Sequence, residues 1–170
     1  PVDGAFSQYI SHPEGFLFHI PEALSYEEAT LNEPFSVGVQ ACKRANVQPG
    51  STVVIMGMGP AGLMAVVAAK ACGATKIIVS DLEKIRLAEA LKLGATHAIN
   101  IKEEDVATRI NEITKGKGVN YAFETAGNPI ALQNALASLN NGCTLAIVGL
   151  PQQENIELNI PFIANHEINI

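Results

Sequence analysis

The sequence predicts an α/β fold in which a doubly wound parallel sheet is covered by helices on both faces. Apolar runs of strand length alternate five times with segments of helical periodicity. Glycine marks the short turns between them. The strand-like runs lack polar alternation, which is typical of strands buried on both faces. Right-handed connections between such strands place helices on both sides of the sheet.

The first residues of the chain have a different character. Residues 1–24 place proline and glycine between short apolar pieces, which favours extended strands and turns. The segment SYEE then has a capping-box pattern, in which Ser25 and Glu28 start a helix. The following NEP is expected to interrupt that helix, because a residue before proline disfavours helical backbone. A second helix is expected to carry Pro34 in its first turn and to end near Asn46.

From Ser51 onward the expected elements alternate regularly. Strands are expected at 51–56, 76–80, 96–100, 119–125 and 143–148. Helices are expected from the turn after the first strand to Cys72, and at 82–93, 103–115 and 129–140. Asn128 is a favourable N-cap, with Pro129 at the first helical position. A sixth strand is expected to begin near Glu167.

A glycine-rich turn follows the first of these strands. Gly57, Gly59 and Gly62 have the spacing GxGxxG. The first permits a tight turn, the second lets a diphosphate approach the backbone, and the third lets the helix pack close to the sheet. The helix start offers N–H groups to an anion, and Pro60 removes one of them at little cost. By itself the pattern is weak, because a glycine-rich turn can serve chain geometry alone.

An acid at the end of the second expected strand strengthens this interpretation. Asp81 lies 19 residues after Gly62. A carboxylate there can accept hydrogen bonds from an adenosine ribose and repels a 2′-phosphate. We therefore expect dinucleotide binding, with NAD favoured over NADP. Asp81 could instead cap the following helix. Arg86, one helical turn further on, is expected near the same ribose, although an ordinary surface role fits it equally.

Composition narrows the choice of partners. The 170 residues are 48% hydrophobic, which is sufficient for a packed core. Acids outnumber bases 17 to 11 and no basic cluster occurs, which argues against nucleic acid or an anionic membrane as a partner. No apolar run could span a bilayer and no leader is visible, so a cytoplasmic location is expected. Neither the histidines nor the cysteines show a zinc-site spacing; Cys42, Cys72 and Cys143 are expected to be buried thiols.

Several blocks of sequence together resemble the medium-chain dehydrogenase family, and most of all its zinc-dependent polyol branch of sorbitol and xylitol dehydrogenases. These blocks are DGAFSQYISHP, HIPEALSYEEATLNEPFSVGVQACKRA, GMGPAGL, SDLEKIR, FETAG and LAIVGL. The resemblance covers nearly the whole chain. It implies that residues 1–33 are the β-rich tail of a GroES-like catalytic domain. Residues 34–48 are then a connecting helix, and 49–170 an NAD-binding Rossmann domain that stops in its sixth strand.

The resemblance also implies roles for individual residues. The cofactor site matches Gly57, Gly59, Pro60, Ala61, Gly62, Asp81 and Arg86. Thr125 matches the strand end beside the adenosine half, and Val148, Gly149 and Leu150 match the segment beside the nicotinamide. Glu33 matches the acid that approaches the catalytic zinc directly or through water, whereas from the sequence alone it is a solvated acid at a helix break. Phe6, Tyr9 and Leu150 are candidates for an apolar wall facing the substrate.

The implied function is NAD- and zinc-dependent oxidation of a polyol secondary alcohol to a ketose. Zinc lowers the pKa of the alcohol, and hydride passes to the nicotinamide. The family's principal zinc ligands, a cysteine and a His–Glu pair, precede Pro1, so the chain alone is expected to be inactive. One alternative is another zinc alcohol dehydrogenase, acting on butanediol, threonine or a sugar-alcohol phosphate. A second alternative is a non-catalytic NAD-binding or dimerisation module. A homo-dimer or homo-tetramer is expected, with residues 155–160 (NIELNI) as a possible edge strand.

Overall fold

The computed structural model describes residues 4–170 and divides into two units, Pro1–Asn32 and Glu33–Ile170, which we describe separately. The first unit contains a short 3₁₀ helix, η1 (Glu14–Phe16), and the helix α1 (Tyr26–Thr30). The predicted capping box is confirmed. The Ser25 side chain accepts a hydrogen bond from the Glu28 N–H, and the Glu28 carboxylate accepts one from the Ser25 N–H at 2.9 Å.

The strands expected near the beginning of the chain are not seen. Within residues 4–32 the structure has turns, η1 and α1, and almost every residue is exposed. Isolated extended backbone is not a strand, because its N–H and C=O groups must be paired by a neighbouring segment. Within the described residues no segment pairs with it, so the β-rich expectation does not hold for residues 4–32.

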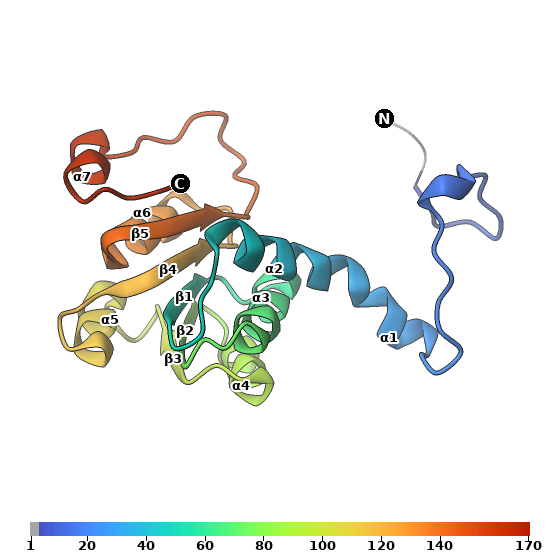
Figure 1. Cartoon of the computed structure of the whole chain (residues 1–170), viewed down its shortest axis with the longest axis horizontal. Helices are drawn as coiled ribbons and strands as arrows, with labels where there is room; N and C mark the ends of the chain where they lie inside the picture. The colour runs from blue at the N-terminus through green and yellow to red at the C-terminus, as the bar shows by residue number, and fades with distance from the viewer. Residues whose placement is uncertain (1–3) are drawn as a thin grey trace. The chain divides into compact units, whose positions relative to one another are not determined.

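The second unit contains the sheet. Its strands are β1 (Thr52–Met56), β2 (Lys76–Asp81), β3 (His97–Asn100), β4 (Val119–Glu124) and β5 (Leu139–Ile147). The helices are α2 (Asn32–Ala45), α3 (Pro60–Ala71), α4 (Lys84–Leu93), α5 (Val106–Thr114), α6 (Pro129–Ser138) and α7 (Ile160–Asn165). Every strand pair is parallel, and the order is β3-β2-β1-β4-β5 (Figure 1). This confirms the doubly wound sheet.

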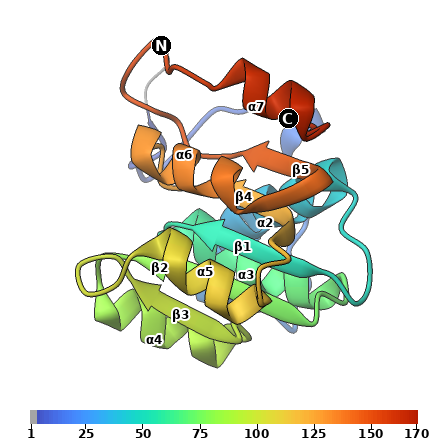
Figure 2. The ribbon, with the colours of Figure 1, turned by 90° about the vertical axis from the view of Figure 1, so that its left-hand side faces the viewer.

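Helices cover both faces because successive side chains of each strand point in opposite directions. In β1, Val53 and Ile55 join a core with residues of α2, α3 and α4, whereas Val54 and Met56 join a second core with α5 and α6. Figure 2 shows α5 and α6 on one side of the sheet and α3 and α4 on the other. Burying one such side chain contributes roughly 1.5–3 kcal/mol. The unbroken apolar runs of the sequence therefore stabilise two cores at once.

Helix starts follow the predicted signals closely. Asn128 caps α6, because its side-chain oxygen accepts hydrogen bonds from the N–H groups of Ile130 and Ala131 at 2.8 and 3.3 Å. Pro129 occupies the first position of that helix. The chain then passes directly into β5, which begins at Leu139 rather than at the predicted residue 143.

The prediction of an edge strand at 155–160 is wrong. Residues 155–159 form no strand, and Ile156 and Leu158 pack instead against the second core. Asn159 caps α7, with its side chain accepting from the Phe162 N–H at 3.0 Å, and Pro161 lies in the first turn of that helix. The expected sixth strand is represented by one parallel bridge between Thr144 and Asn169. No helix in the described part of the chain is long and apolar enough to cross a bilayer.

Candidate functional site

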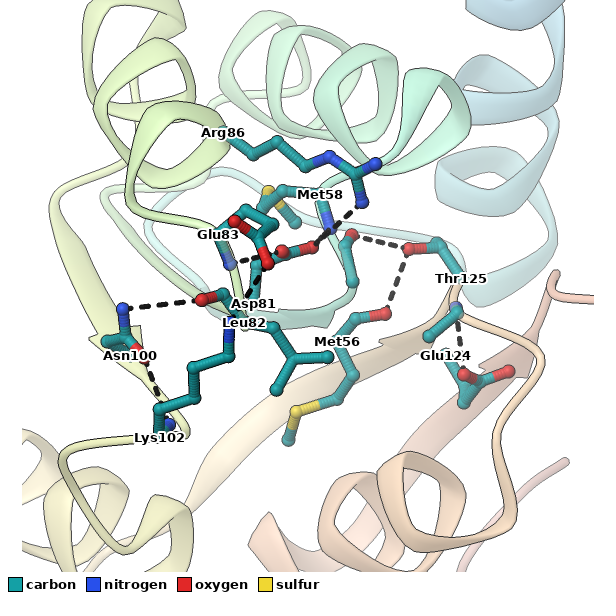
Figure 3. A network of polar contacts seen from close by, with 12 residues as sticks. Met56, Met58, Asp81, Leu82, Glu83, Arg86, Asn100, Lys102, Glu124 and Thr125 are labelled. Carbon is teal, nitrogen blue, oxygen red and sulfur yellow. Dashed lines mark hydrogen bonds and ion pairs between the residues drawn. The ribbon is translucent and has the colours of Figure 1, made fainter.

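The candidate site lies at the carboxyl ends of β1, β2 and β4. The chain runs from β1 to β2 and β3 on one side and to β4 and β5 on the other, so the connections diverge on either side of β1. Helices on opposite faces leave a crevice at such a switch point, which is where open parallel sheets bind ligands. Figure 3 shows polar side chains from the ends of β2 and β4 converging on the turn after β1.

The turn after β1 has the geometry that its glycines predict. Gly57 has a φ of 96°, which is suited to glycine. A Cβ on Gly62 would lie 1.9 Å from the Gly57 carbonyl oxygen, so any larger residue would separate helix from strand. At Gly59, in contrast, an added Cβ would meet no heavy atom within 4 Å. The turn is closed behind Gly62 and open beside Gly59.

The start of α3 faces this open space. Gly59 is its N-cap residue, and no side chain caps the helix. Pro60 occupies the first turn, followed by Ala61 and Gly62. The first-turn N–H groups of a helix have no partner within it and carry partial positive charge. This arrangement suits an anionic group beside Gly59.

Asp81 ties the glycine turn to the end of β2. Its carboxylate accepts hydrogen bonds from the Met58 N–H at 2.7 Å and from the Glu83 N–H at 2.8 Å (Figure 3). Arg86 Nη1 lies 3.8 Å from Asp81 Oδ2. The alternative role as a helix cap is not observed, because Glu83 is the N-cap of α4 and no side chain caps that helix. Each carboxylate oxygen can accept a further bond, so Asp81 can also take a ligand hydroxyl.

Thr125 holds the same turn from the opposite side. Its hydroxyl lies 2.7 Å from the Gly57 carbonyl oxygen and 2.9 Å from that of Met56, and can donate to either. Its N–H donates to Met56 O at 2.9 Å. The end of β4 is thereby fixed against the glycine turn.

A cavity of about 680 Å³ opens at these strand ends. It is lined by the predicted residues Gly57, Gly59, Asp81, Arg86 and Thr125, and by Met56, Ser80, Leu82, Glu83, Ile101, Val106, Ala126, Asn128, Ile130, Ala131 and Asn134. Apolar side chains such as Leu82 and Ile101 were missed, although each directly follows a strand. A larger cavity of about 1200 Å³, between α2, β4 and β5, includes Val148 but none of the glycine-turn residues.

Glu124 is a buried acid that sequence reasoning missed. It ends β4 and is only 2% exposed. Its carboxylate accepts hydrogen bonds from the N–H groups of Ala126, Gly127 and Asn128 at 2.8, 3.2 and 3.4 Å. Burial raises the pKa of Glu124 above its ordinary value, and these three bonds oppose that effect. The available signal was an acid closing an apolar strand, the same pattern that drew attention to Asp81.

The strand-end segment Val148, Gly149 and Leu150 lies against the turn that follows β4. The N–H groups of Val148 and Gly149 donate to the Glu124 carbonyl oxygen at 2.8 and 2.9 Å. A Cβ on Gly149 would lie 2.1 Å from the Gly127 nitrogen. The predicted nicotinamide segment and the β4–α6 turn are therefore in direct contact.

Several predicted residues of the second unit are not among those that line this cavity: Glu33, Pro60, Ala61, Gly62, Val148, Gly149 and Leu150. Glu33 is exposed in the first turn of α2, and its carbonyl oxygen accepts from the Ser36 hydroxyl. Within residues 4–170 no three His, Cys, Asp or Glu side chains gather as a metal site, so these residues alone do not fit a zinc ion. Phe6 and Tyr9 are exposed in the first unit, and Leu150 is exposed in the second. The zinc role of Glu33 and the apolar substrate wall stay predictions.

The parallel doubly wound sheet with a glycine turn at its switch point defines a Rossmann-like domain. The chain belongs to the zinc-binding dehydrogenase family, whose model matches residues 60–170. Sorbitol dehydrogenase of Bacillus subtilis (strain 168) is 63% identical over the whole chain. The chain covers 48% of that relative, and so spans about half its length.

Solved structures show the same relationship. An oxidoreductase/dehydrogenase of unknown specificity from Escherichia coli aligns with a TM-score of 0.90 at 39% identity, covering 98% of this chain and 48% of that one. Galactitol-1-phosphate dehydrogenase from Escherichia coli aligns with a TM-score of 0.88 at 28% identity, covering 98% and 49%. The predicted membership of the zinc-dependent alcohol dehydrogenases is confirmed.

Proposed function

We propose that this chain is the NAD-binding part of a dehydrogenase that transfers hydride from a secondary alcohol of a polyol to NAD, giving a ketose. The observation that carries the proposal is the open space beside Gly59, next to the buried carboxylate of Asp81. A diphosphate can enter where a Cβ would project, and a ribose hydroxyl can donate to the acid. Bound NAD would supply the hydride acceptor.

Each part of the site has a role in holding NAD. The first-turn N–H groups of α3 meet the diphosphate, and Asp81 accepts from the adenosine ribose while disfavouring a 2′-phosphate. Leu82 and Ile101 offer apolar surface to the adenine. The segment from Val148 to Leu150 bounds the nicotinamide side. Residues 4–170 contain no ligand set for a metal, so these residues take part in no step at zinc beyond the predicted contact of Glu33.

The polyol substrate is proposed from similarity. Identity of 63% to a sorbitol dehydrogenase supports sorbitol or a closely related polyol. A sugar-alcohol phosphate has weaker support, because the galactitol-1-phosphate dehydrogenase is 28% identical. Comparing kcat/KM of the full-length protein for sorbitol and for galactitol 1-phosphate separates the two, and we expect sorbitol to be preferred. A homo-dimer or homo-tetramer stays a prediction, which analytical ultracentrifugation would test.

Calorimetric titration tests the cofactor site. The full-length protein should bind NAD more tightly than NADP. Asp81→Ala should weaken NAD binding and narrow that difference, while the control Glu112→Gln, an exposed acid on α5, should change neither affinity. Tighter binding of NADP, or equal NAD affinity in the Asp81 variant, would contradict the proposal. The 170-residue chain alone should show no turnover, and zinc-dependent polyol oxidation by it would contradict that prediction.

A further inference from the structure

Glu124 occupies a position that the proposed function leaves unexplained. Its side chain and its backbone bond to two different segments of the chain. The carboxylate holds three successive N–H groups of the β4–α6 turn, residues 125–128. The carbonyl oxygen of the same residue accepts from Val148 and Gly149, in the strand-end segment 148–150.

We propose that Glu124 is a positioning residue that fixes the β4–α6 turn against the strand-end segment, and so sets the spacing between the adenosine and nicotinamide halves of the site. This inference rests on the proposed function. The turn contributes Thr125, Ala126 and Asn128 to the cavity at the adenosine side. The strand-end segment bounds the nicotinamide side. One buried residue therefore bonds to both walls that a dinucleotide must span.

Contacts around Glu124 leave little freedom for this spacing. A Cβ on Gly149 would lie 2.7 Å from Glu124 Oε2 as well as 2.1 Å from the Gly127 nitrogen, so only glycine fits between the two segments. Within residues 4–170 no ion pair reaches Glu124, and its polar partners are backbone N–H groups. The position of the turn therefore depends on the two acceptor oxygens.

Replacing Glu124 by glutamine tests this dependence with almost no change of volume. The amide has one acceptor oxygen and an NH₂ group, whereas the carboxylate has two acceptor oxygens. In Glu124→Gln, at least one N–H of the turn must face another donor, so the turn shifts away from the strand-end segment. The turn is only one part of the adenosine side. Asp81 and Ile101, at the ends of β2 and β3, lie outside the turn and should keep most of the affinity for AMP.

The measurement is calorimetric binding of NAD and of AMP to the full-length protein, because AMP occupies only the adenosine half. Glu124→Gln should lower NAD affinity roughly tenfold. Its AMP affinity should stay within about twofold of the wild type. The control Glu112→Gln, which also removes one acid, should change neither. Gly149→Ala pushes the same two segments apart while keeping the acid, and should reproduce the loss for NAD but not for AMP.

Each other outcome has a defined meaning. If a variant lost affinity for NAD and for AMP by the same factor, the whole site would be disturbed, and the inference would be overturned. Unchanged affinities in both variants would overturn it as well. If circular dichroism shows one variant to be unfolded, the NAD and AMP affinities of the other variant provide the test. A wild-type protein that binds no NAD would overturn both the proposed function and the inference. If the wild type binds NAD and the ratio of NAD affinity to AMP affinity is the same in the variants as in the wild type, the inference alone would be overturned.

Discussion

The backbone N–H of Met58 donates a 2.7 Å hydrogen bond to the carboxylate of Asp81, which joins the glycine turn after β1 to the last residue of β2. This acid therefore shapes the turn as well as facing the cavity. Shaping the turn and facing the cavity are two separate roles of Asp81. Substitutions elsewhere in the turn can test them separately, because one glycine affects the shape of the turn and another affects its open side.

Gly62 determines the shape of the turn, and Gly59 borders its open side. Gly62→Ala should destabilise the protein by about 3 kcal/mol, because its Cβ would overlap the Gly57 carbonyl. Gly59→Ala should cost less than about 1 kcal/mol, the difference between glycine and alanine at an N-cap. It should nevertheless abolish NAD binding, because its Cβ fills the space proposed for the diphosphate. Urea unfolding and calorimetry measure the two effects, and unchanged NAD affinity in Gly59→Ala would contradict the site.

Thr125 should contribute to stability through its hydroxyl. Thr125→Val keeps the shape of the side chain but removes the bond to the Gly57 and Met56 carbonyls, and should lower the free energy of unfolding by about 1 kcal/mol. Thr125→Ser retains a hydroxyl and should recover part of the loss. Urea midpoints of the three proteins provide the comparison. A valine variant as stable as the wild type would show that the bond has no net effect.

Glu124 should give a specific dependence of stability on pH. Burial raises its pKa in the folded protein, so folding favours the protonated form. Its contribution to stability is therefore greatest below its unfolded pKa and is lost as the pH rises through the raised value. Compared with Glu124→Gln, which does not titrate, the wild type should lose stability over that interval. Urea unfolding of both proteins between pH 4 and 8, as a rough range, tests this; a constant difference would contradict it.

The cysteines should differ in reactivity. Burial, followed by the neighbouring Cys72, raises the pKa of Cys42 to about 12, so almost no thiolate forms at neutral pH. Cys42 is buried as predicted, whereas Cys72, at the C-cap of α3, and Cys143, in β5, are only half-buried. Iodoacetamide should label Cys72 before Cys42 in the native protein. Mass spectrometry of digested samples over time would show this order, and equal rates would contradict it.

Much of the fold could be predicted because the strands of a sheet covered on both faces are uninterrupted apolar runs. β1, β2, β3 and β4 each fall within two residues of their predicted ends. α7 was missed because NIELNI alternates like a strand, while the stronger signals are Asn159 and Pro161. In this segment the capping residues, rather than the alternation, determine the structure.

The site could be predicted only in part, for a different reason. Glycine spacing and a terminal acid are visible as residue types, so the sequence could single out Gly57, Gly59 and Asp81, which line the cavity. Their role in binding NAD stays a prediction. Glu124 and Met58 act through backbone N–H groups, which every residue except proline carries. An acid at a strand end is visible in the sequence, but the N–H groups that it bonds depend on the path of the chain, so these bonds could not be predicted.

The lining of the cavity also bears on how cellular salt would affect this protein. Among its lining residues the acids Asp81 and Glu83 accompany a single base, Arg86. A dinucleotide diphosphate would therefore be met chiefly by neutral peptide dipoles rather than by lysine or arginine. Salt screens exposed ion pairs strongly, but acts much less on short contacts to buried dipoles. A site built this way should hold its cofactor almost equally well in dilute and in concentrated electrolyte, which would make its occupancy largely independent of osmotic changes.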